Sequence, residues 1–231
     1  MPSLLPGWIL ALFIVTTLVT GWLFFRAIPE RFIRTPLIIT LIWMGLQALL
    51  GLSEFYLVSD TLPPRAGLLI IPVLLLMVYV FIREHAWLDS LDLGALTAIH
   101  LVRIPVELVL WGLHQVALVP KLMTFEGQNF DILIGLSAIL VLRQGFVQPG
   151  NTPRRIWLIV WNLVGLIFLL NIVVLAVLSL PTQLQQLAFE QPNLAVMYFP
   201  FVWLPAFIVP VVMLSHLAAL RQLLRPGARP A

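Results

Sequence analysis

The chain has 231 residues, of which 61% are hydrophobic and only 10% are charged. A soluble globular protein carries about 25% charged residues, so this composition excludes a water-soluble domain and predicts an all-α integral membrane protein. The basic residues are dispersed and form no run that could make one basic surface, so we expect no nucleic-acid partner. The sequence contains no cysteine, so any metal site would need histidine or carboxylate ligands.

Seven apolar segments are long enough to cross about 30 Å of hydrocarbon as helices. Proline residues fall in most of the gaps between them, where a missing amide proton does least harm. We therefore expect one membrane domain over residues 1–231 with seven transmembrane helices. The expected spans are residues 8–25, 36–58, 66–83, 93–118, 130–147, 156–180 and 194–220.

The basic residues also predict the orientation of the chain, because they accumulate in the loops on the cytoplasmic side. Alternate loops hold ten arginines on one side but only Arg65 and Lys121 on the other. We expect the N-terminus outside and the C-terminus in the cytoplasm of a bacterial cell, with the chain in the cytoplasmic membrane. The ten arginines are Arg26, Arg31, Arg34, Arg83, Arg143, Arg154, Arg155, Arg221, Arg225 and Arg229.

The fourth expected span carries a stripe of polar residues. His100, Arg103, Glu107, Trp111 and His114 follow one another at intervals of 3, 4, 4 and 3 residues, which places them on one side of a helix. Ionisable groups cost about 3 kcal/mol each in hydrocarbon on insertion scales, so they usually mark a functional interior. Arg103 and Glu107 are one turn apart, and we expect them to pair with each other as a clamp or a gate.

A second set of polar residues, the outer set, is expected near the outer ends of spans two, four and five. Glu54 lies on the face of span two that also carries Gln47, His114 ends span four, and Asp131 begins span five. If they converge, their imidazole and carboxylate groups suit a divalent metal ion or a proton relay. Alternatively, Asp131 only favours the dipole of its helix and Glu54 lies in water at the interface. Residues 120–131 connect spans four and five. They are either a lid that folds back over the outer set or a loop that lies at the membrane interface.

A third group, His100, Asn162, His216 and Arg143, is expected near the cytoplasmic boundary. A single histidine in a helix is more often hydrogen-bonded structure than a ligand, and an asparagine often joins two membrane helices, so we interpret this group as structural. The fourteen-residue spacing of His100 and His114 resembles that of haem ligands in membrane cytochromes b. No second helix carries a matching pair, so we expect no haem.

The sequence leaves three functions open. The leading hypothesis is transport of a small solute or ion through a cleft lined by spans two, four and five. The ligand would be held or gated by Gln47 and by the stripe residues His100, Arg103, Glu107 and Trp111. The second hypothesis is a membrane-embedded enzyme with a divalent metal on the outer set, where bound water would be the nucleophile. The third is a non-catalytic subunit whose stripe contacts a partner helix. The outward N-terminus is similar to that of small sugar and vitamin transporters.

Overall fold

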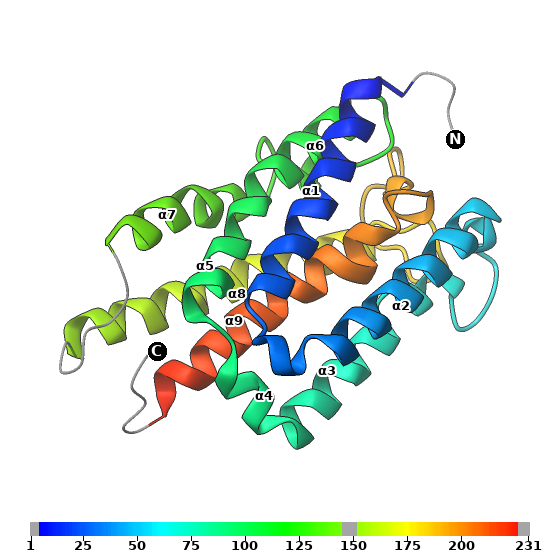
Figure 1. The fold of residues 1–231 in the computed structure, drawn as a ribbon. Coiled ribbons are helices and arrows are strands. Elements are labelled where there is room, and N and C mark those ends of the chain that lie inside the picture. The colour runs from blue at the N-terminus through cyan, green and yellow to red at the C-terminus, as the bar shows by residue number, and fades with distance from the viewer. Residues whose placement is uncertain (1–4, 145–151, 226–231) are drawn as a thin grey trace.

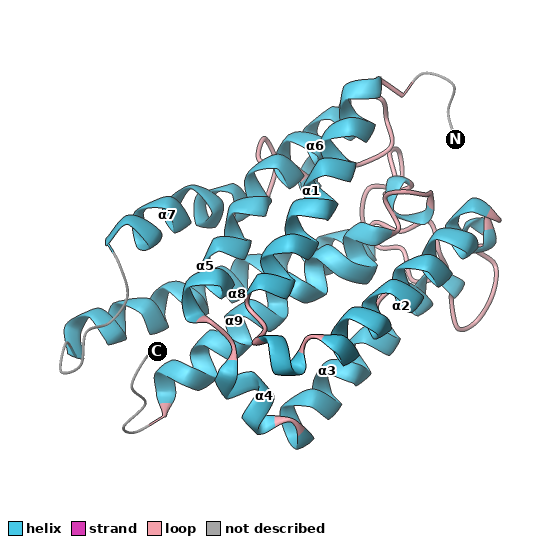
Figure 2. Cartoon of the chain, in the orientation of Figure 1, coloured by secondary structure: helices cyan, strands magenta, loops and turns pink. Residues whose placement is uncertain are grey.

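The structure is a computed structural model that describes residues 5–144 and 152–225. Within these ranges the chain forms helices and no strand (Figure 2). The last residues of the expected fifth span, 145–147, lie outside the described residues, as does Arg229 of the tail. The side chains of residues 152 and 153 also lie outside them.

The helices follow one another along the chain with short connections. The α-helices are α1 (Gly7–Arg26), α2 (Arg34–Leu52), α3 (Ile71–Arg83), α4 (His85–Ser90), α5 (Leu93–Ile99), α6 (Arg103–Gln115), α7 (Asp131–Gln144), α8 (Thr152–Leu178) and α9 (Val209–Leu224). The shorter turns are η1 (Glu30–Phe32), η2 (Phe55–Leu57), η3 (Arg65–Leu69), η4 (His100–Val102), η5 (Lys121–Met123), η6 (Ala195–Met197) and the π-helical η7 (Leu204–Ile208).

Six helical segments of the described chain are long and apolar enough to cross a membrane. They are Gly7–Arg26, Arg34–Leu52, Arg65–Arg83, Leu93–Gln115, Arg154–Leu178 and Leu204–Leu224. These segments support the prediction of an all-helical membrane protein. The count of seven stays a prediction, because α7, which occupies the expected fifth span, has 14 described residues and is about 21 Å long.

Two expected spans are too long. The second ends at Leu52 rather than at residue 58, because Glu54 adopts a left-handed backbone with φ of 57° and starts a turn. The last begins at Leu204 rather than at residue 194. The intervening residues form η6 and an irregular turn, which Pro200 favours because the residue before a proline is disfavoured in a helix.

The interior of the molecule is built around α9 and the α5–α6 segment. α9 packs against α8 and α5, while α1 packs against α5 and α6, and α7 packs against α6. In the spans Leu93–Gln115 and Leu204–Leu224, 61% of the residues are buried, against 11% in the α2 span and 17% in the α3 span. In Figure 1, α2 and α3 both lie below the main bundle, away from α7.

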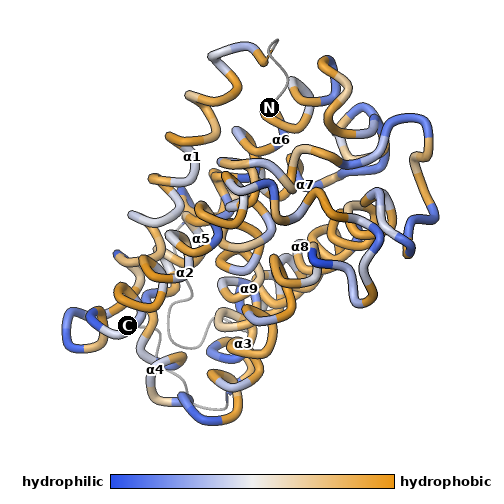
Figure 3. The backbone as a smooth tube through the Cα atoms, turned by 90° about the vertical axis from the view of Figure 1, so that its right-hand side faces the viewer, coloured by the Kyte–Doolittle hydropathy of each residue, from blue (hydrophilic) through white to orange (hydrophobic). Residues whose placement is uncertain are grey.

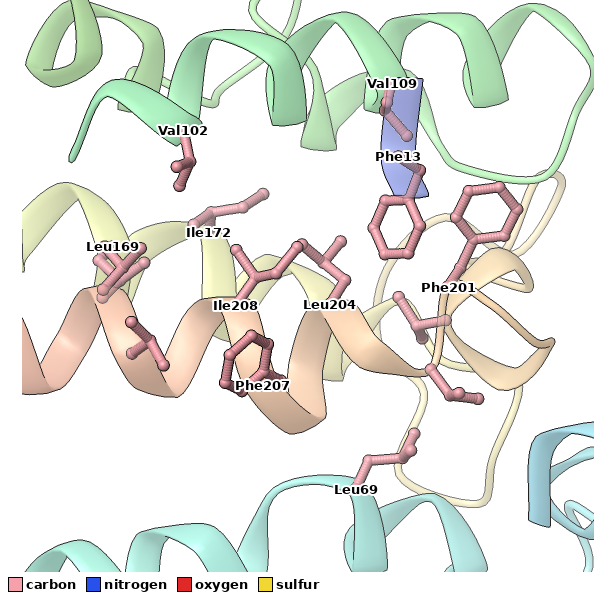
Figure 4. Close-up of a cluster of buried hydrophobic side chains, with 14 of the residues drawn as sticks. Phe13, Leu69, Val102, Val109, Leu169, Ile172, Phe201, Leu204, Phe207 and Ile208 are labelled. Carbon is pink, nitrogen blue, oxygen red and sulfur yellow. The ribbon is translucent and has the colours of Figure 1, made fainter. Parts of the chain in front are cut away.

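Large apolar side chains fill the space between α1, α6, α8 and η7 (Figure 4). The rings of Phe13 and Phe201 lie 4.9 Å apart at their centroids, next to Val109. Figure 3 shows hydrophobic residues along the helices and most hydrophilic residues in the connections at their ends. Polar side chains in the interior of such a bundle are therefore exceptions that need an explanation.

Candidate functional site

Seven buried polar residues lie together in the interior of the bundle, and we call them the buried polar cluster. They come from the α5–α6 segment, from the start of α7, from α8 and from α9. None is more than 6% exposed to solvent. The members are His100, Arg103, Glu107, Asn129, Asp131, Asn162 and His216.

Arg103 is the centre of this cluster. Its Nη1 donates to Asp131 Oδ1 at 3.0 Å, and Nη1 and Nη2 donate to the carbonyl of Gly165 at 3.3 and 3.2 Å. Its Nη2 also lies 2.9 Å from His216 Nε2. One guanidinium thus joins α6 to α7, α8 and α9, which satisfies most of its donors without water.

The two neighbours of His216 determine its tautomer. Because an arginine can only donate, His216 Nε2 accepts from Arg103, and the ring proton belongs on Nδ1. Nδ1 lies 2.9 Å from Asn162 Oδ1, and the amide of Asn162 donates to the carbonyl of Leu158 at 2.9 Å. The ring of His100 stacks on His216 with centroids 3.9 Å apart and an interplanar angle of 22°. The His216 imidazole is therefore hydrogen-bonded through both ring nitrogens and stacked against His100 on one face.

A glycine makes this arrangement sterically feasible. A Cβ atom at Gly165 would lie 2.4 Å from His216 Cε1 and 2.6 Å from Nε2. Any other residue would push the imidazole away from Arg103. Gly165 lies one turn after Asn162 on α8, so the same helix face supplies the hydrogen-bond partner of His216, the space for its ring, and a carbonyl for Arg103.

Glu107 lies next to Asn129 on the other side of Arg103. The Asn129 amide donates to Glu107 Oε1 and to the carbonyl of Met123, and its Oδ1 accepts from the N–H of Asp131. The second oxygen of Glu107, Oε2, is buried and has no hydrogen bond of good geometry among the described residues, although the backbone of Phe125 interacts with this carboxylate. Glu107 is the least satisfied charged group of the cluster.

α7 begins deep inside the bundle rather than at its surface. Its first residue, Asp131, contacts Arg103, which lies ten residues, or about 15 Å, from the start of the span Leu93–Gln115. Residues 116–130 run back along α6 to reach this level, and Asn171 of α8 donates to the carbonyl of Gln128 at 2.8 Å. The irregular segment therefore covers the part of the crossing that precedes α7.

The expected pairing of Arg103 with Glu107 is wrong. Arg103 forms its ion pair with Asp131, whereas Glu107 accepts from Asn129. Glu107 still interacts electrostatically with Arg103. The physical reason is that residues 116–130 insert Asn129 and Asp131 beside the stripe, and a carboxylate on a facing element reaches the guanidinium better than one on the same helix.

The convergence expected of the outer set is wrong as well. Glu54 is exposed in the turn after α2, and Asp131 lies inside with Arg103. His114 Nδ1 lies 3.1 Å from both the carbonyl of Val119 and the amide of Gln191. The described residues contain no group of three histidines or carboxylates that could hold a metal ion. Residues 120–131 cover no such site, because they turn inward along α6.

Gln47 and Trp111 are also separate from the cluster. Gln47 is buried, but it accepts from the hydroxyl of Tyr56 and donates to the carbonyl of Leu68, which ties α2 to η3. Burial raises the pKa of Tyr56, which follows the end of α2, to about 12, so its hydroxyl remains a proton donor. Trp111 donates to Glu126 at 2.9 Å near the end of α6. The described residues therefore do not form a single cleft lined by spans two, four and five.

Three members of the third predicted group do come together. His216 contacts both His100 and Asn162, whereas Arg143 is exposed near the last described residue of α7. The prediction placed them apart from Arg103, but the structure joins them to it through His216. Asn129 was not expected at all, and its only signal was its position two residues before Asp131.

Comparison with known proteins gives one result. The family model described as "Domain of unknown function (DUF8737)" matches residues 63–224, a range that includes every residue of the buried polar cluster. No curated protein and no solved structure matches this chain.

Proposed function

We propose that this chain, which belongs to the DUF8737 family, binds a proton or another small monovalent cation in the buried polar cluster as part of the transport of a small solute. The observation that carries the proposal is the charge balance of the cluster. It holds two carboxylates, Glu107 and Asp131, but a single guanidinium, Arg103. With both carboxylates ionised and both imidazoles neutral, one negative charge is left over.

An uncompensated charge is costly in a membrane interior, so the cluster favours one added positive charge. Asp131 already shares a hydrogen-bonded ion pair with Arg103, whereas Glu107 has no ion pair among the described residues. Glu107 is 1% exposed and Oε2 lacks a well-aligned donor. The extra cation therefore belongs at Glu107, and Asn129 and the carbonyl of Met123 lie beside it.

The backbone near the cluster also supports transport. Irregular segments and half-helices at membrane depth are typical of transporters, in which they lie next to the bound ion. α7 begins at this depth, and its first residue contacts Arg103. Because Arg103 also binds α8 and α9, a change of charge at Glu107 or Asp131 alters the contacts among three helices. This coupling is what a transporter needs to change its conformation with ion binding.

The same proposal includes the topology. Residues 116–130 together with α7 would complete a fifth crossing, which makes seven, with the N-terminus outside and the C-terminus in the cytoplasm of a bacterial cell. The arginines at the end of α1, the start of α2 and the end of α3 support this orientation, because they fall at the end of the bundle where α9 also finishes (Figure 1).

Infrared spectroscopy of the reconstituted protein tests ion binding at Glu107. A protonated carboxyl has a C=O band that an ionised one lacks. We expect such a band to disappear from the wild type when pH is raised or when sodium displaces the proton, and to be absent from Glu107→Gln. Glu30→Gln, at an exposed glutamate in η1, is the control and should keep the band. A wild-type spectrum from Glu107→Gln would exclude this site.

A further inference from the structure

A groove of about 700 Å³ is lined by α2, α3, the end of α1, η7 and α9. It does not include the buried polar cluster. Its walls are mostly apolar, and they include Ile39 and Trp43 of α2, Val73 and Leu76 of α3, Phe207 of η7 and Val211 of α9. This volume falls within the range of about 300–1,000 Å³ that is usual for small-molecule sites.

At the inner end of the groove, a hydrogen bond joins α2 to η7. The indole N–H of Trp43 donates to the carbonyl of Ala206 at 3.0 Å. In a regular helix this carbonyl would accept from residue 210, but Pro210 has no amide proton. The hydrogen bond of Trp43 to this carbonyl therefore joins α2 to η7 at this level.

The other end of the groove is charged. Arg31 and Arg34, both exposed, line it together with Glu84 on the opposite wall. Trp87 also lines it, and its buried indole Nε1 has no hydrogen-bond partner among the described residues. From Arg34 to Trp43 the helix rises about 14 Å, which is close to half of the hydrocarbon thickness of a bilayer. The groove thus has the depth of one leaflet.

We propose that this groove binds one anionic phospholipid of the leaflet on the basic side of the membrane. One acyl chain lies along the apolar walls, and the phosphate lies between Arg31 and Arg34, because guanidinium groups bind phosphate oxygens in pairs of hydrogen bonds. The unpartnered indole N–H of Trp87 is a third donor at that end. Basic pockets between membrane helices at this level typically bind anionic lipid head groups.

The exposure of α2 and α3 argues for a lipid from the bilayer rather than for a soluble ligand. The α2 and α3 spans are only 11% and 17% buried, so lipid surrounds both of these groove-lining helices. A phospholipid can enter sideways without leaving the membrane. Its bound form would fill the groove.

Native mass spectrometry of the delipidated full-length protein tests this proposal. The protein is incubated with equal amounts of phosphatidylglycerol and phosphatidylcholine, and the lipid retained by each molecule is measured. Since a basic residue near the membrane contributes about fivefold to anionic-lipid binding, Arg31→Gln with Arg34→Gln should weaken phosphatidylglycerol binding about thirtyfold. Arg83→Gln, an exposed arginine at the same end but outside the groove lining, should leave it unchanged.

A second pair of variants tests the apolar part of the site. Val73→Trp would fill the groove, and we expect it to weaken phosphatidylglycerol binding about tenfold through loss of acyl-chain burial. Val78→Trp, at a valine of α3 that is 55% exposed and does not line the groove, should bind as the wild type does. Equal retention of the two lipids, displacement of both by a free fatty acid, or wild-type binding by the double arginine variant would overturn the proposal.

Discussion

Arg103 can occupy the interior of a membrane helix because Asp131 lies beside it. The pair is 3.0 Å apart, and the side chains are 3% and 9% exposed. When Glu107 is protonated, removal of one partner leaves a buried charge uncompensated, whereas removal of both leaves two polar groups that are neutral. The energetic effect of each substitution therefore depends on the residue that remains.

We expect Asp131→Asn to lower the free energy of unfolding by about 3–5 kcal/mol, and we expect the double variant Arg103→Gln, Asp131→Asn to recover most of that loss. Thermal unfolding in detergent measures both. The pair Arg221–Asp89, which is about 20% exposed and lies at the end of α9, is the control. Breaking it should cost about 1 kcal/mol or less. Single and double variants of equal stability would show that Arg103 and Asp131 are not partners.

The small size of Gly165 is essential for the cluster, because the His216 ring occupies the space that a side chain at this position would need. We expect Gly165→Ala to displace the imidazole and to lower the free energy of unfolding by about 1–3 kcal/mol, as overpacking does. Gly45→Ala is the control, since nothing lies within 4 Å of a Cβ atom there. It should be neutral or slightly stabilising. A melting temperature of Gly165→Ala that matches that of Gly45→Ala would contradict the close approach.

At the scale of elements, the most consequential feature is the segment before α7. Residues 116–130 form only the short turn η5, and several of them are exposed, but Leu118, Met123 and Asn129 are buried. Asn129 is hydrogen-bonded to Met123, Asp131 and Glu107, so its polar groups are paired with protein rather than with water. The segment thereby places Asp131 next to Arg103, and without it the cluster would lack one of its two carboxylates.

The absence of cysteine allows this segment to be mapped by single cysteine substitutions without background. Phe130 is 48% exposed and its ring lies 5.7 Å from that of Phe168, in the middle of α8, so it faces lipid. We expect Phe130→Cys to react with a lipid-soluble maleimide but not with a membrane-impermeant one. Glu126→Cys, near the end of α6, should react with both. Fast reaction of Phe130→Cys with the impermeant reagent would place the segment at the membrane surface instead.

At the scale of the whole molecule, charge is distributed unevenly between the two ends of the bundle. Asp89 of α4 binds Arg221 at 2.9 Å and also pairs with Arg225, so the end of α9 is joined to the connection between α3 and α5. Arg26, Arg34 and Arg83 end or begin helices on the same side. This end is the one that the positive-inside rule assigns to the cytoplasm.

We expect a reporter fused after Arg229 to show a cytoplasmic C-terminus, because the loops on that side hold ten arginines. A fluorescent protein, which matures only in the cytoplasm, should be bright at this position, and alkaline phosphatase should be inactive. The same reporters fused within residues 58–64 should give the reverse result. An active phosphatase after Arg229 would invert the topology and would place the lipid groove in the outer leaflet.

The sequence by itself determined that the protein is helical and apolar enough to span a membrane, because composition and the length of apolar runs depend on local chemistry alone. It also identified His100, Arg103 and Glu107 as inward-facing, because the helical period decides which residues share a face. The tertiary structure alone decided their partners. A helical period does not say which element packs against that face, and hydropathy does not show that α7 begins deep inside the bundle after an irregular segment. Asp131 and His216 reach Arg103, and Asn162 reaches His216, only because α7, α8 and α9 pack around α6.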